Sequence, residues 1–438
     1  MSLISTFRRG GVHPADMKDL SKGKAIERLP LPEELLLSMS QHLGAPATSL
    51  KKKGDSVKRG ELVGQASSFI SADVHSPVDG IVKEVRKVRL ASGAVADALV
   101  ITVNPEQEPD PFTEEYDYSN LSSAELLALV KQRGIVGMGG ATFPTNVKFS
   151  SPTGKKVDAL IVNGVECEPY LTSDYRTMME RAEGLLEGVM IASRIVNPSK
   201  IAIGVEQNKM AAVAHLEEVI KAKGYPIEVY ALKMKYPQGD EKQLIKAVIN
   251  REVPSGKLPL DVGAVVANAS TCFAIYEAVK FHKPLMERVV SITGECVNDT
   301  KNVIAPIGTK ARDLFSYAGG VDESILDKFV SGGPMMGFAF ADLDCPMTKG
   351  TSGLLALPIK ITANTMPCVS CGRCVAHCPM GLMPNRMYRN IMHGEYQEAM
   401  DLGLMDCKEC GCCAYECPSA LPLVQSFKLG KKLGRKKK

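Results

Sequence analysis

Cysteines near the C-terminus have the spacing of metal or cluster ligands. Of the 13 cysteines in the chain, nine lie between Cys368 and Cys417. Eight of them form two runs, Cys368-x2-Cys371-x2-Cys374-x3-Cys378-Pro379 and Cys407-x2-Cys410-x2-Cys413-x3-Cys417-Pro418. Each cysteine of the second run lies 39 residues after its counterpart, which indicates an internal duplication. Thiolates at this density predict redox chemistry at iron–sulfur centres.

The spacing is that of bacterial two-cluster ferredoxins, in which the fourth cysteine of each run ligates the other cluster. We therefore predict two [4Fe–4S] clusters. The first is assigned to Cys368, Cys371, Cys374 and Cys417, and the second to Cys407, Cys410, Cys413 and Cys378. Cys412 has no place in the spacing and is predicted to be a small apolar residue.

Three other interpretations of the cysteines are weaker or remain open. A disulfide framework requires an oxidising compartment, and the N-terminus lacks the apolar core of a secretory signal. Structural zinc normally uses paired C-x2-C knuckles. A purely structural cluster remains the alternative, but a duplicated pair of adjacent clusters favours electron transfer.

A second candidate site begins with a glycine-rich loop, Gly137-Met138-Gly139-Gly140-Ala141-Thr142-Phe143-Pro144-Thr145. Glycines at this density allow backbone N–H groups to approach a phosphate closely. The loop is neither a Walker A loop nor a Rossmann fingerprint, because no Gly-Lys-Ser/Thr follows and no strand precedes it. Taken alone, such a turn is more often an ordinary loop.

The elements that would position this loop alternate between strand-like and helical patterns. Strands are predicted at 159–162, 201–205, 227–232 and 264–267, and helices at about 177–196, 209–223 and 241–250. An earlier helix begins at the capping box formed by Ser122 and Glu125 and ends at Gly134. This order predicts a mostly parallel sheet with helices on both faces.

Polar segments follow these strands: Asn163–Glu168, Tyr236–Glu241 and Asn268–Thr271. Ligands of open α/β sheets bind outside the carboxyl ends of the strands. Together with Lys148, which follows the glycine-rich loop, the segments predict one ligand site.

These loops resemble the FMN- and NADH-binding subunit of respiratory complex I in the GxGGAxFPT loop, the NxxExEP segment, the Gly-Asp-Glu turn and the Asn-x-x-Thr segment. The resemblance implies that Gly137, Gly139, Gly140 and Ala141 cradle the FMN phosphate or NADH. It implies that Lys148 and Asn163 contact the flavin and that Glu166 and Glu168 face the nicotinamide. It also implies that Asp240 and Glu241 contact the cofactor and that Asn268 and Thr271 close the FMN pocket. Met138, Val165 and Gln238 depart from the family pattern of Arg, Asp and Cys. No side chain is expected to act as a catalytic acid or base.

The flanking segments add two β modules. The segment from Leu50 to Val88 resembles biotinyl and lipoyl carrier domains, but Phe69–Ser71 occupy the hairpin tip where the modified lysine would stand. Residues 289–318 resemble a β-grasp module, and Ser331–Gly337 is interpreted as a linker, with an interface loop as the alternative.

We therefore predict a multidomain α/β and β chain with a parallel α/β flavin-type domain and a C-terminal ferredoxin-like α domain. The predicted boundaries are an N-terminal segment 1–28, an unmodified carrier-like β domain 29–106, an FMN/NADH-binding domain 107–284, a β-grasp module 285–345, a double-cluster domain 346–427 and a basic tail 428–438.

This domain order resembles the C subunit of the Rnf complex, the electron-transport complex that links ferredoxin and NAD. The resemblance implies a peripheral subunit on the cytoplasmic face of the inner membrane, with FMN, NAD(H), two [4Fe–4S] clusters and other Rnf subunits as cofactors and partners. It also implies that the complex translocates Na⁺ or H⁺. Two alternatives remain: the cobalamin reductase of propanediol-utilisation microcompartments, and an electron carrier with an inactive flavin pocket. The A subunit of the Na⁺-translocating NADH:quinone reductase lacks the double cysteine runs.

Composition excludes several other classes. The chain has 438 residues, 45% of them hydrophobic and 23% charged, which fits an ordered globular protein. Its last eleven residues hold seven basic ones, more than the whole net charge of +4. The remainder is slightly acidic and the whole chain is 5% aromatic, so no nucleic-acid partner is expected. No apolar run is long enough for a transmembrane helix.

The basic tail is interpreted as a solvated terminus, with membrane docking as the alternative.

Overall fold

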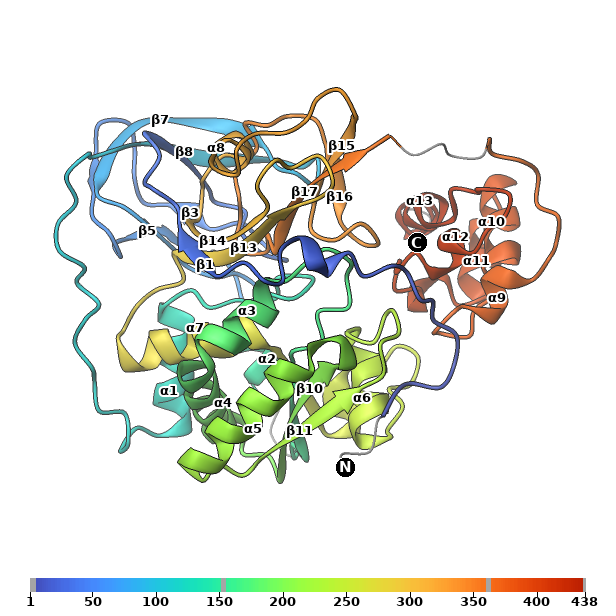
Figure 1. Cartoon of the computed structure of the whole chain (residues 1–438), viewed down its shortest axis with the longest axis horizontal. Coiled ribbons are helices and arrows are strands. Elements are labelled where there is room, and N and C mark those ends of the chain that lie inside the picture. Colours follow the sequence, from blue (N-terminus) through green and yellow to red (C-terminus); the bar gives the residue numbers. More distant parts are fainter. Residues whose placement is uncertain (1–4, 151–154, 360–363, 436–438) are drawn as a thin grey trace.

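The computed structural model describes residues 5–150, 155–359 and 364–435. Two β units lie above an α/β unit, and a small helical unit lies to one side (Figure 1). The N-terminal segment runs along the helical unit and then crosses between the upper and lower layers. It carries the short helix η1 (Lys18–Leu20).

The first β unit is built from two sheets. One has the order β2 (Glu34–Ser38), β8 (Val95–Val103), β7 (Gly80–Arg89) and β4 (Ser56–Val57), and the other has β3 (Thr48–Ser49), β5 (Leu62–Gln65) and β6 (Val74–His75). All of the pairings are antiparallel. Apolar side chains such as Leu35, Val63 and Leu99 are fully buried between them, as expected when one face of each sheet is covered.

The central unit is the predicted parallel sheet. Its order is β11 (Ile227–Leu232), β10 (Lys200–Glu206), β9 (Ala159–Asn163) and β12 (Ala264–Asn268). One face packs against the helices α4 (Ala182–Val196), α5 (Met210–Lys223) and α7 (Ala269–Lys280), and α1 (Ser123–Gln132) packs on α4 and α7. The other face packs against α6 (Glu241–Ile249). The shorter elements are α2 (Thr145–Phe149), α3 (Ser173–Glu180), η2 (Gln207–Lys209) and η3 (Pro259–Val262). The four strands and the capping box of Ser122 and Glu125 are confirmed.

The second β unit is a mixed six-stranded sheet that recruits strands from outside its predicted limits. Its order is β1 (Ile26–Arg28), β14 (Lys301–Pro306), β13 (Glu287–Thr293), β17 (Gly353–Pro358), β15 (Leu326–Ser331) and β16 (Phe338–Phe340), with α8 (Ala311–Tyr317) beside it. β1 belongs to the predicted N-terminal segment and β17 to the predicted cluster domain. The boundaries at 28 and 345 therefore need correction, because β1 pairs with β14 at one edge of the sheet and β17 pairs with both β13 and β15 in its middle.

The Ser331–Gly337 run is not a linker. It connects β15 and β16, which pair antiparallel, and it is therefore the loop of a hairpin. The backbone N–H of Met335 in this loop donates to the Glu168 carboxylate at 3.0 Å. The interface-loop alternative is the correct one.

The helical unit holds both cysteine runs. Its elements are α9 (Arg373–Ala376), α10 (Pro384–Met392), α11 (Tyr396–Asp401), η4 (Leu404–Asp406), α12 (Cys412–Tyr415) and α13 (Leu423–Arg435). Met387, Leu404 and Phe427 form the centre of its core. The described part of the predicted basic tail continues α13, and Lys431 binds the Glu409 carboxylate and the Cys407 carbonyl. Residues 436–438 lie outside the described residues.

Candidate functional site

The sheet has a topological switch point between β9 and β12. The chain runs from β9 outward to β10 and β11, and then returns to place β12 on the other side of β9. All four strands are parallel, so their carboxyl ends share one edge. At that edge Asn163 and Asn268 are register partners. A crevice outside the carboxyl ends at a switch point is where such sheets bind ligands.

The glycine-rich loop lies against this edge. The Met138 N–H donates to Thr271 Oγ1 at 2.9 Å, and the Gly139 backbone packs so closely on Asn268 that a Cβ there would lie 2.9 Å from Nδ2. Gly140 has φ +106°, and a Cβ at this residue would meet no atom within 4 Å. Gly140 and Ala141 are exposed. The loop thus offers an open, side-chain-poor surface of the kind that phosphate-binding loops need.

The remaining strand-end segments meet the same edge. Asn163 Nδ2 donates to the Gly239 carbonyl at 2.8 Å, and Lys148 Nζ pairs with Glu241 at 2.5 Å. Asp240 is the N-cap of α6 and accepts from the N–H groups of Lys242 and Gln243. The structure therefore brings together Asn163, Asn268, Thr271, Lys148, Glu241 and Gly139, while Asp240 serves the start of a helix.

The two glutamates of the Asn163–Glu168 segment point elsewhere. The Glu166 carboxylate accepts from the Asp174 N–H at 2.8 Å, at the start of α3. Glu168 accepts from the Met335 N–H and lies 3.4 Å from the Tyr236 hydroxyl. Burial raises the pKa of the Glu168 carboxyl to about 7. Glu168 therefore lies at the junction with the helical unit.

The three departures from the complex I pattern have local explanations. The Met138 and Val165 side chains are buried in the two cores that flank the sheet. Gln238 is fully buried, and its Oε1 accepts from the Thr6 hydroxyl at 2.8 Å. All three side chains are thus buried in the interior of the protein.

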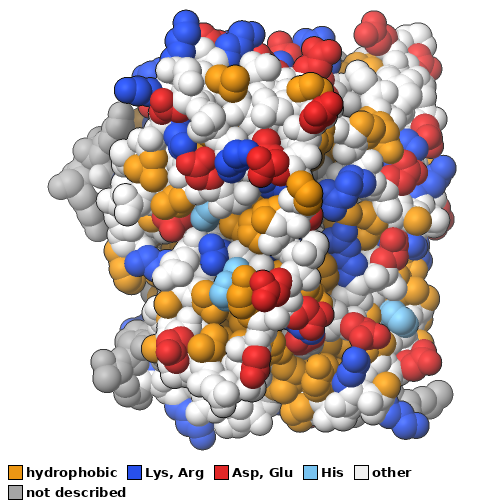
Figure 2. All heavy atoms as spheres, turned by 90° about the vertical axis from the view of Figure 1, so that its left-hand side faces the viewer, with side chains coloured by type: hydrophobic (Ala, Val, Ile, Leu, Met, Phe, Trp, Pro, Cys, Tyr) orange, Lys and Arg blue, Asp and Glu red, His pale blue; other side chains and the backbone are white. Residues whose placement is uncertain are grey.

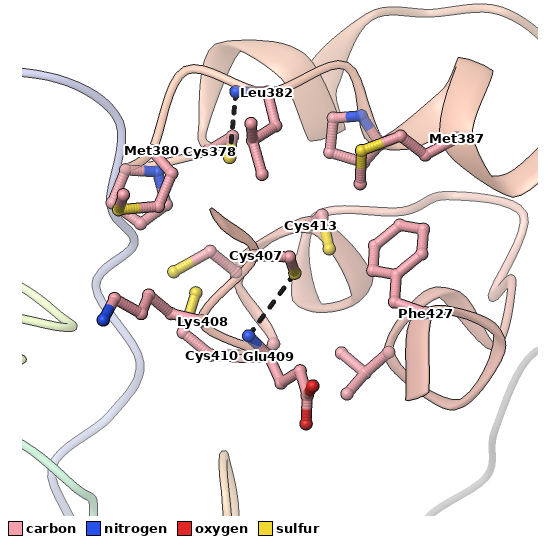
Figure 3. Close-up of a pocket in the computed structure, with 15 residues that line it drawn as sticks. Cys378, Met380, Leu382, Met387, Cys407, Lys408, Glu409, Cys410, Cys413 and Phe427 are labelled. Carbon is pink, nitrogen blue, oxygen red and sulfur yellow. Dashed lines mark hydrogen bonds between the residues drawn. The ribbon is translucent and has the colours of Figure 1, made fainter. Parts of the chain in front are cut away.

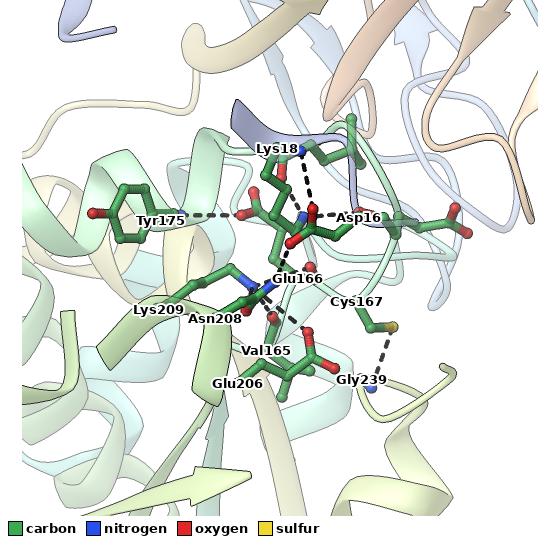
Figure 4. Close-up of polar contacts among 12 residues, drawn as sticks. Asp16, Lys18, Val165, Glu166, Cys167, Tyr175, Glu206, Asn208, Lys209 and Gly239 are labelled. Carbon is green, nitrogen blue, oxygen red and sulfur yellow. Dashed lines mark hydrogen bonds and ion pairs between the residues drawn. The ribbon is translucent and has the colours of Figure 1, made fainter. Parts of the chain in front are cut away.

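The sequence did not predict several charged residues at the site. Lys18 and Lys209 are almost fully buried beneath the loop that follows β9, beside Glu206 and Glu166 (Figure 4). Asp174 accepts from Asn268 Nδ2 at 2.7 Å. Lys209 follows a strand end, which is the signal that identified the other segments. Only the folded structure shows that Lys18 and Asp174 belong to the site.

Five cysteines line one cavity, and four of them belong to the two spaced runs, the fifth being Cys412. Its lining includes Cys378 of the first run together with Cys407, Cys410 and Cys413 of the second. Figure 3 shows their side chains converging, with Met387 and Phe427 on the apolar side. Burial, followed by the nearby thiols of Cys407, Cys410 and Cys378, raises the pKa of the Cys413 thiol. Four convergent sulfur donors fit the chemistry of a cubane cluster.

The other set is more accessible. Cys368 and Cys371 are exposed, Cys374 is buried and Cys417 is half-buried. Burial raises the pKa of the Cys374 thiol, and the neighbouring Cys371 and Cys368 act in the same direction. Across the described residues, no group of three or more His, Cys, Asp or Glu side chains is arranged to hold a single metal ion.

The flavin-type unit and the helical unit touch through Tyr236. Its hydroxyl donates to the Cys410 carbonyl at 2.8 Å, and its own carbonyl accepts from the Val12 N–H at 2.9 Å. Cys412 is fully buried in the same contact, which agrees with a packing role. The edge of the sheet and one set of thiols are thus directly connected.

The face of the molecule shown in Figure 2 has no large patch of a single charge sign. Acidic and basic side chains are interspersed there, with apolar groups between them. Within residues 5–150, 155–359 and 364–435, no helix has the length and apolar character needed to cross a bilayer.

Comparison with protein families assigns a description to each unit. The matching families are the RnfC barrel sandwich hybrid domain at residues 6–106, the Nuo51 FMN-binding domain at 130–277, the SLBB domain at 289–339 and the 4Fe-4S dicluster domain at 360–418. The predicted multidomain fold class is confirmed.

Curated proteins resemble the chain over nearly its whole length. The C subunit of the proton-translocating ferredoxin:NAD(+) oxidoreductase complex of Clostridium ljungdahlii is 41% identical over 91% of this chain and 87% of its own. The C subunit of the Na(+)-translocating complex of Acetobacterium woodii is 40% identical, over 98% and 96%. The C subunit of the ion-translocating oxidoreductase complex of Rhodobacter capsulatus is 39% identical, over 97% and 82%.

A solved structure shares the fold. An NAD+-reducing [NiFe]-hydrogenase in the H2-reduced state aligns with a TM-score of 0.50 and 17% identity, over 71% of this chain and 62% of that chain. At this identity the likeness concerns the arrangement of elements alone.

Proposed function

The chain belongs to the family of C subunits of ion-translocating ferredoxin:NAD oxidoreductases, the Rnf complexes, and we propose that in such a complex it exchanges electrons between NAD(H), a bound FMN and two [4Fe–4S] clusters. It is an electron-transfer subunit with an FMN-binding domain and a dicluster domain. A flavin accepts a hydride and passes on single electrons. It can therefore connect a nicotinamide, which gives up two electrons as a hydride, with a cluster, which carries one electron at a time.

The flavin would be held at the switch point. Gly139, Gly140 and Ala141 supply an open backbone surface, and Asn163 and Asn268 flank it. Thr271 fixes the loop through the Met138 N–H. Lys148, paired with Glu241, is the predicted cation for an anionic cofactor. The role of these residues is to bind and orient the cofactor.

The clusters would be held by the two thiol sets. Cys378, Cys407, Cys410 and Cys413 share one cavity, and Cys368, Cys371, Cys374 and Cys417 form the more exposed set. The observation that carries the proposal is the Tyr236–Cys410 contact, because it joins the flavin-type site to a cluster ligand within one chain. Redox centres that exchange electrons need such adjacency.

Location and partners follow from the same premise. We propose attachment to the cytoplasmic side of the membrane through other subunits of the complex. The basic residues of α13 are a second candidate contact with anionic lipid. Lys431 is engaged with Glu409 and Cys407, so a clean test replaces Lys432 and Arg435 and leaves the helix intact.

The test is anaerobic reconstitution of the full chain with iron, sulfide and FMN, followed by addition of NADH. We expect stoichiometric FMN, two clusters by iron content, and loss of flavin and cluster absorbance on reduction. Retention of the clusters without FMN binding would favour an electron carrier with an inactive flavin pocket. Reduction of the clusters by dithionite but not by NADH would exclude the dehydrogenase step.

A further inference from the structure

Two buried lysines hold one side of the loop that follows β9. Lys18 Nζ donates to the carbonyl oxygens of Glu168 at 2.9 Å and Leu171 at 2.6 Å. Lys209 Nζ donates to the Val165 carbonyl at 2.8 Å and lies 3.4 Å from the Glu166 carbonyl. Figure 4 shows both ammonium groups approaching the loop. The two lysines are 2% and 1% exposed, so these contacts are shielded from water.

The lysines reach the loop from two distant segments. Lys18 begins η1 in the N-terminal segment, and Lys209 ends η2 directly after β10. Within the loop, Glu166 and Tyr170 have φ of +47° and +70°, a backbone region that L residues adopt rarely and at a cost. Such a conformation persists when surrounding contacts over-determine it. The four lysine contacts supply that constraint.

Packing alone does not require charge here. Burying an ammonium group is strongly unfavourable unless it is paired and hydrogen-bonded, and an apolar side chain of similar volume would fill the space. Burial, followed by repulsion from Lys209, lowers the pKa of Lys18 to about 8. Glu206 lies 3.6 Å from Lys209, and Asn208 links the pair to Asp16 at 3.0 Å.

The loop passes this constraint on to the flavin-type edge. The Glu166 carboxylate accepts from the Asp174 N–H, and the Asp174 carboxylate in turn accepts from Asn268 Nδ2. On the other side, Cys167 Sγ accepts from the Gly239 N–H at 3.3 Å, and Gly239 accepts from Asn163. A shift of the loop would therefore move both asparagines at the switch point.

We propose that Lys18 and Lys209 are positioning residues of the flavin site, acting through the 165–171 loop on Asn163 and Asn268. This inference rests on the proposed function, since it assumes that FMN binds at the switch point. Neither lysine is expected to touch the flavin. Their removal should alter how tightly and in what orientation FMN is held, while the cluster domain keeps its iron.

The test compares FMN dissociation constants for the anaerobically reconstituted full chain and for Lys18→Met, Lys209→Met and the double variant. Each single substitution should weaken FMN binding at least about tenfold, and the double variant should lose less than the product of the two because both act on one loop. The visible circular dichroism of bound FMN, which reports its orientation, should change in each variant. Lys283→Met is the control: Lys283 is also mostly buried but pairs with Glu277 and Glu287, beyond the end of α7 remote from Asn268.

The outcomes separate the two proposals. FMN binding by the wild type with unchanged affinity and dichroism in Lys18→Met and Lys209→Met would overturn the positioning role alone. A wild type that binds no FMN would overturn the proposed function and this inference with it. If a methionine variant does not fold with its full iron content, the corresponding glutamine variant, which keeps an N–H donor, is used instead. Its FMN affinity and dichroism are judged in the same way.

Discussion

The hydroxyl of Tyr236 donates to the backbone carbonyl of Cys410 at 2.8 Å, and this contact lies between the edge of the parallel sheet and one set of four thiols. Tyr236 is 2% exposed, so no water competes for the bond. It follows β11, the edge strand of the parallel sheet, and Cys410 lies in the second cysteine run. The contact therefore helps to fix the orientation of the cluster unit relative to the flavin-type unit, together with the bonds from Gln243 to the Pro379 carbonyl and from Ser255 to Asp406.

Replacing Tyr236 with phenylalanine should weaken this junction. The change leaves the ring in place but leaves a buried carbonyl without a donor, which costs about 1–3 kcal/mol. We expect a lower unfolding temperature and an altered EPR signal of the adjacent reduced cluster. Tyr230→Phe is the control, since that hydroxyl bonds Glu228 and Lys200 on the half-exposed side of the sheet. Equal effects from both variants would show that the junction has no special role.

Gly10 should not tolerate a side chain. It has φ +59°, and a Cβ there would lie 2.6 Å from the backbone carbonyl group of Cys378. Gly10→Ala therefore combines an unfavourable backbone region with a clash against a predicted cluster ligand, and should cost about 3 kcal/mol or more. Gly224→Ala has a similar φ of +68° with no atom within 4 Å, and should cost only about 1 kcal/mol. Thermal unfolding and iron content of the two variants measure the difference.

The cysteine sets predict which substitutions act together. Cys378→Ser and Cys407→Ser should remove the same cluster signal, although the two residues belong to different runs, because both thiols line one cavity. Cys368→Ser should remove the other. EPR spectra of the dithionite-reduced variants and their iron content test the pairing. Cys412→Ser should leave both signals: this residue lines the same cavity, but it has no place in the motif spacing and packs against Tyr236. Loss of different signals in Cys378→Ser and Cys407→Ser would contradict the assignment.

Lys349 should make stability depend on pH. Burial lowers the pKa of Lys349 from 10.5 to about 7, even though its Nζ donates to the carbonyls of Asp73 at 2.7 Å and Gly134 at 2.8 Å. Below the folded pKa, both states hold the proton. Above it the folded protein has lost the proton and the unfolded chain keeps it, so unfolding takes up a proton and the free energy of unfolding rises with pH.

The rise attributable to Lys349 approaches about 1.4 kcal/mol per pH unit at most. Unfolding temperatures of the wild type and Lys349→Met, measured at about pH 7, 8 and 9, isolate it, because the other titrating groups are common to both. The wild type should gain stability relative to the variant as the pH rises. Parallel curves would show that the amine stays charged in the folded protein over this range.

The sequence by itself determined the features that depend on neighbours along the chain. The spacing of eight cysteines, the alternation of strands and helices from 159 to 268, and the polar residues at each strand end follow from local periodicity and motif chemistry. They predicted the parallel sheet and the dicluster domain, and the switch point brings Asn163 and Asn268 together as expected of such sheets.

Only the tertiary structure decided the features that depend on contacts between remote segments. Lys18 meets Glu168 and Leu171 across some 150 positions, β17 enters a sheet begun by β1, and Tyr236 meets Cys410. Glu166 and Glu168 share the polar pattern of the other site residues, but the backbone turn at Glu166 directs their carboxylates to α3 and to Met335. Periodicity fixes which face of an element is buried, but not which distant backbone atoms a buried polar group will find. That pairing is set by the requirement that buried charges and carbonyls be satisfied in the assembled fold.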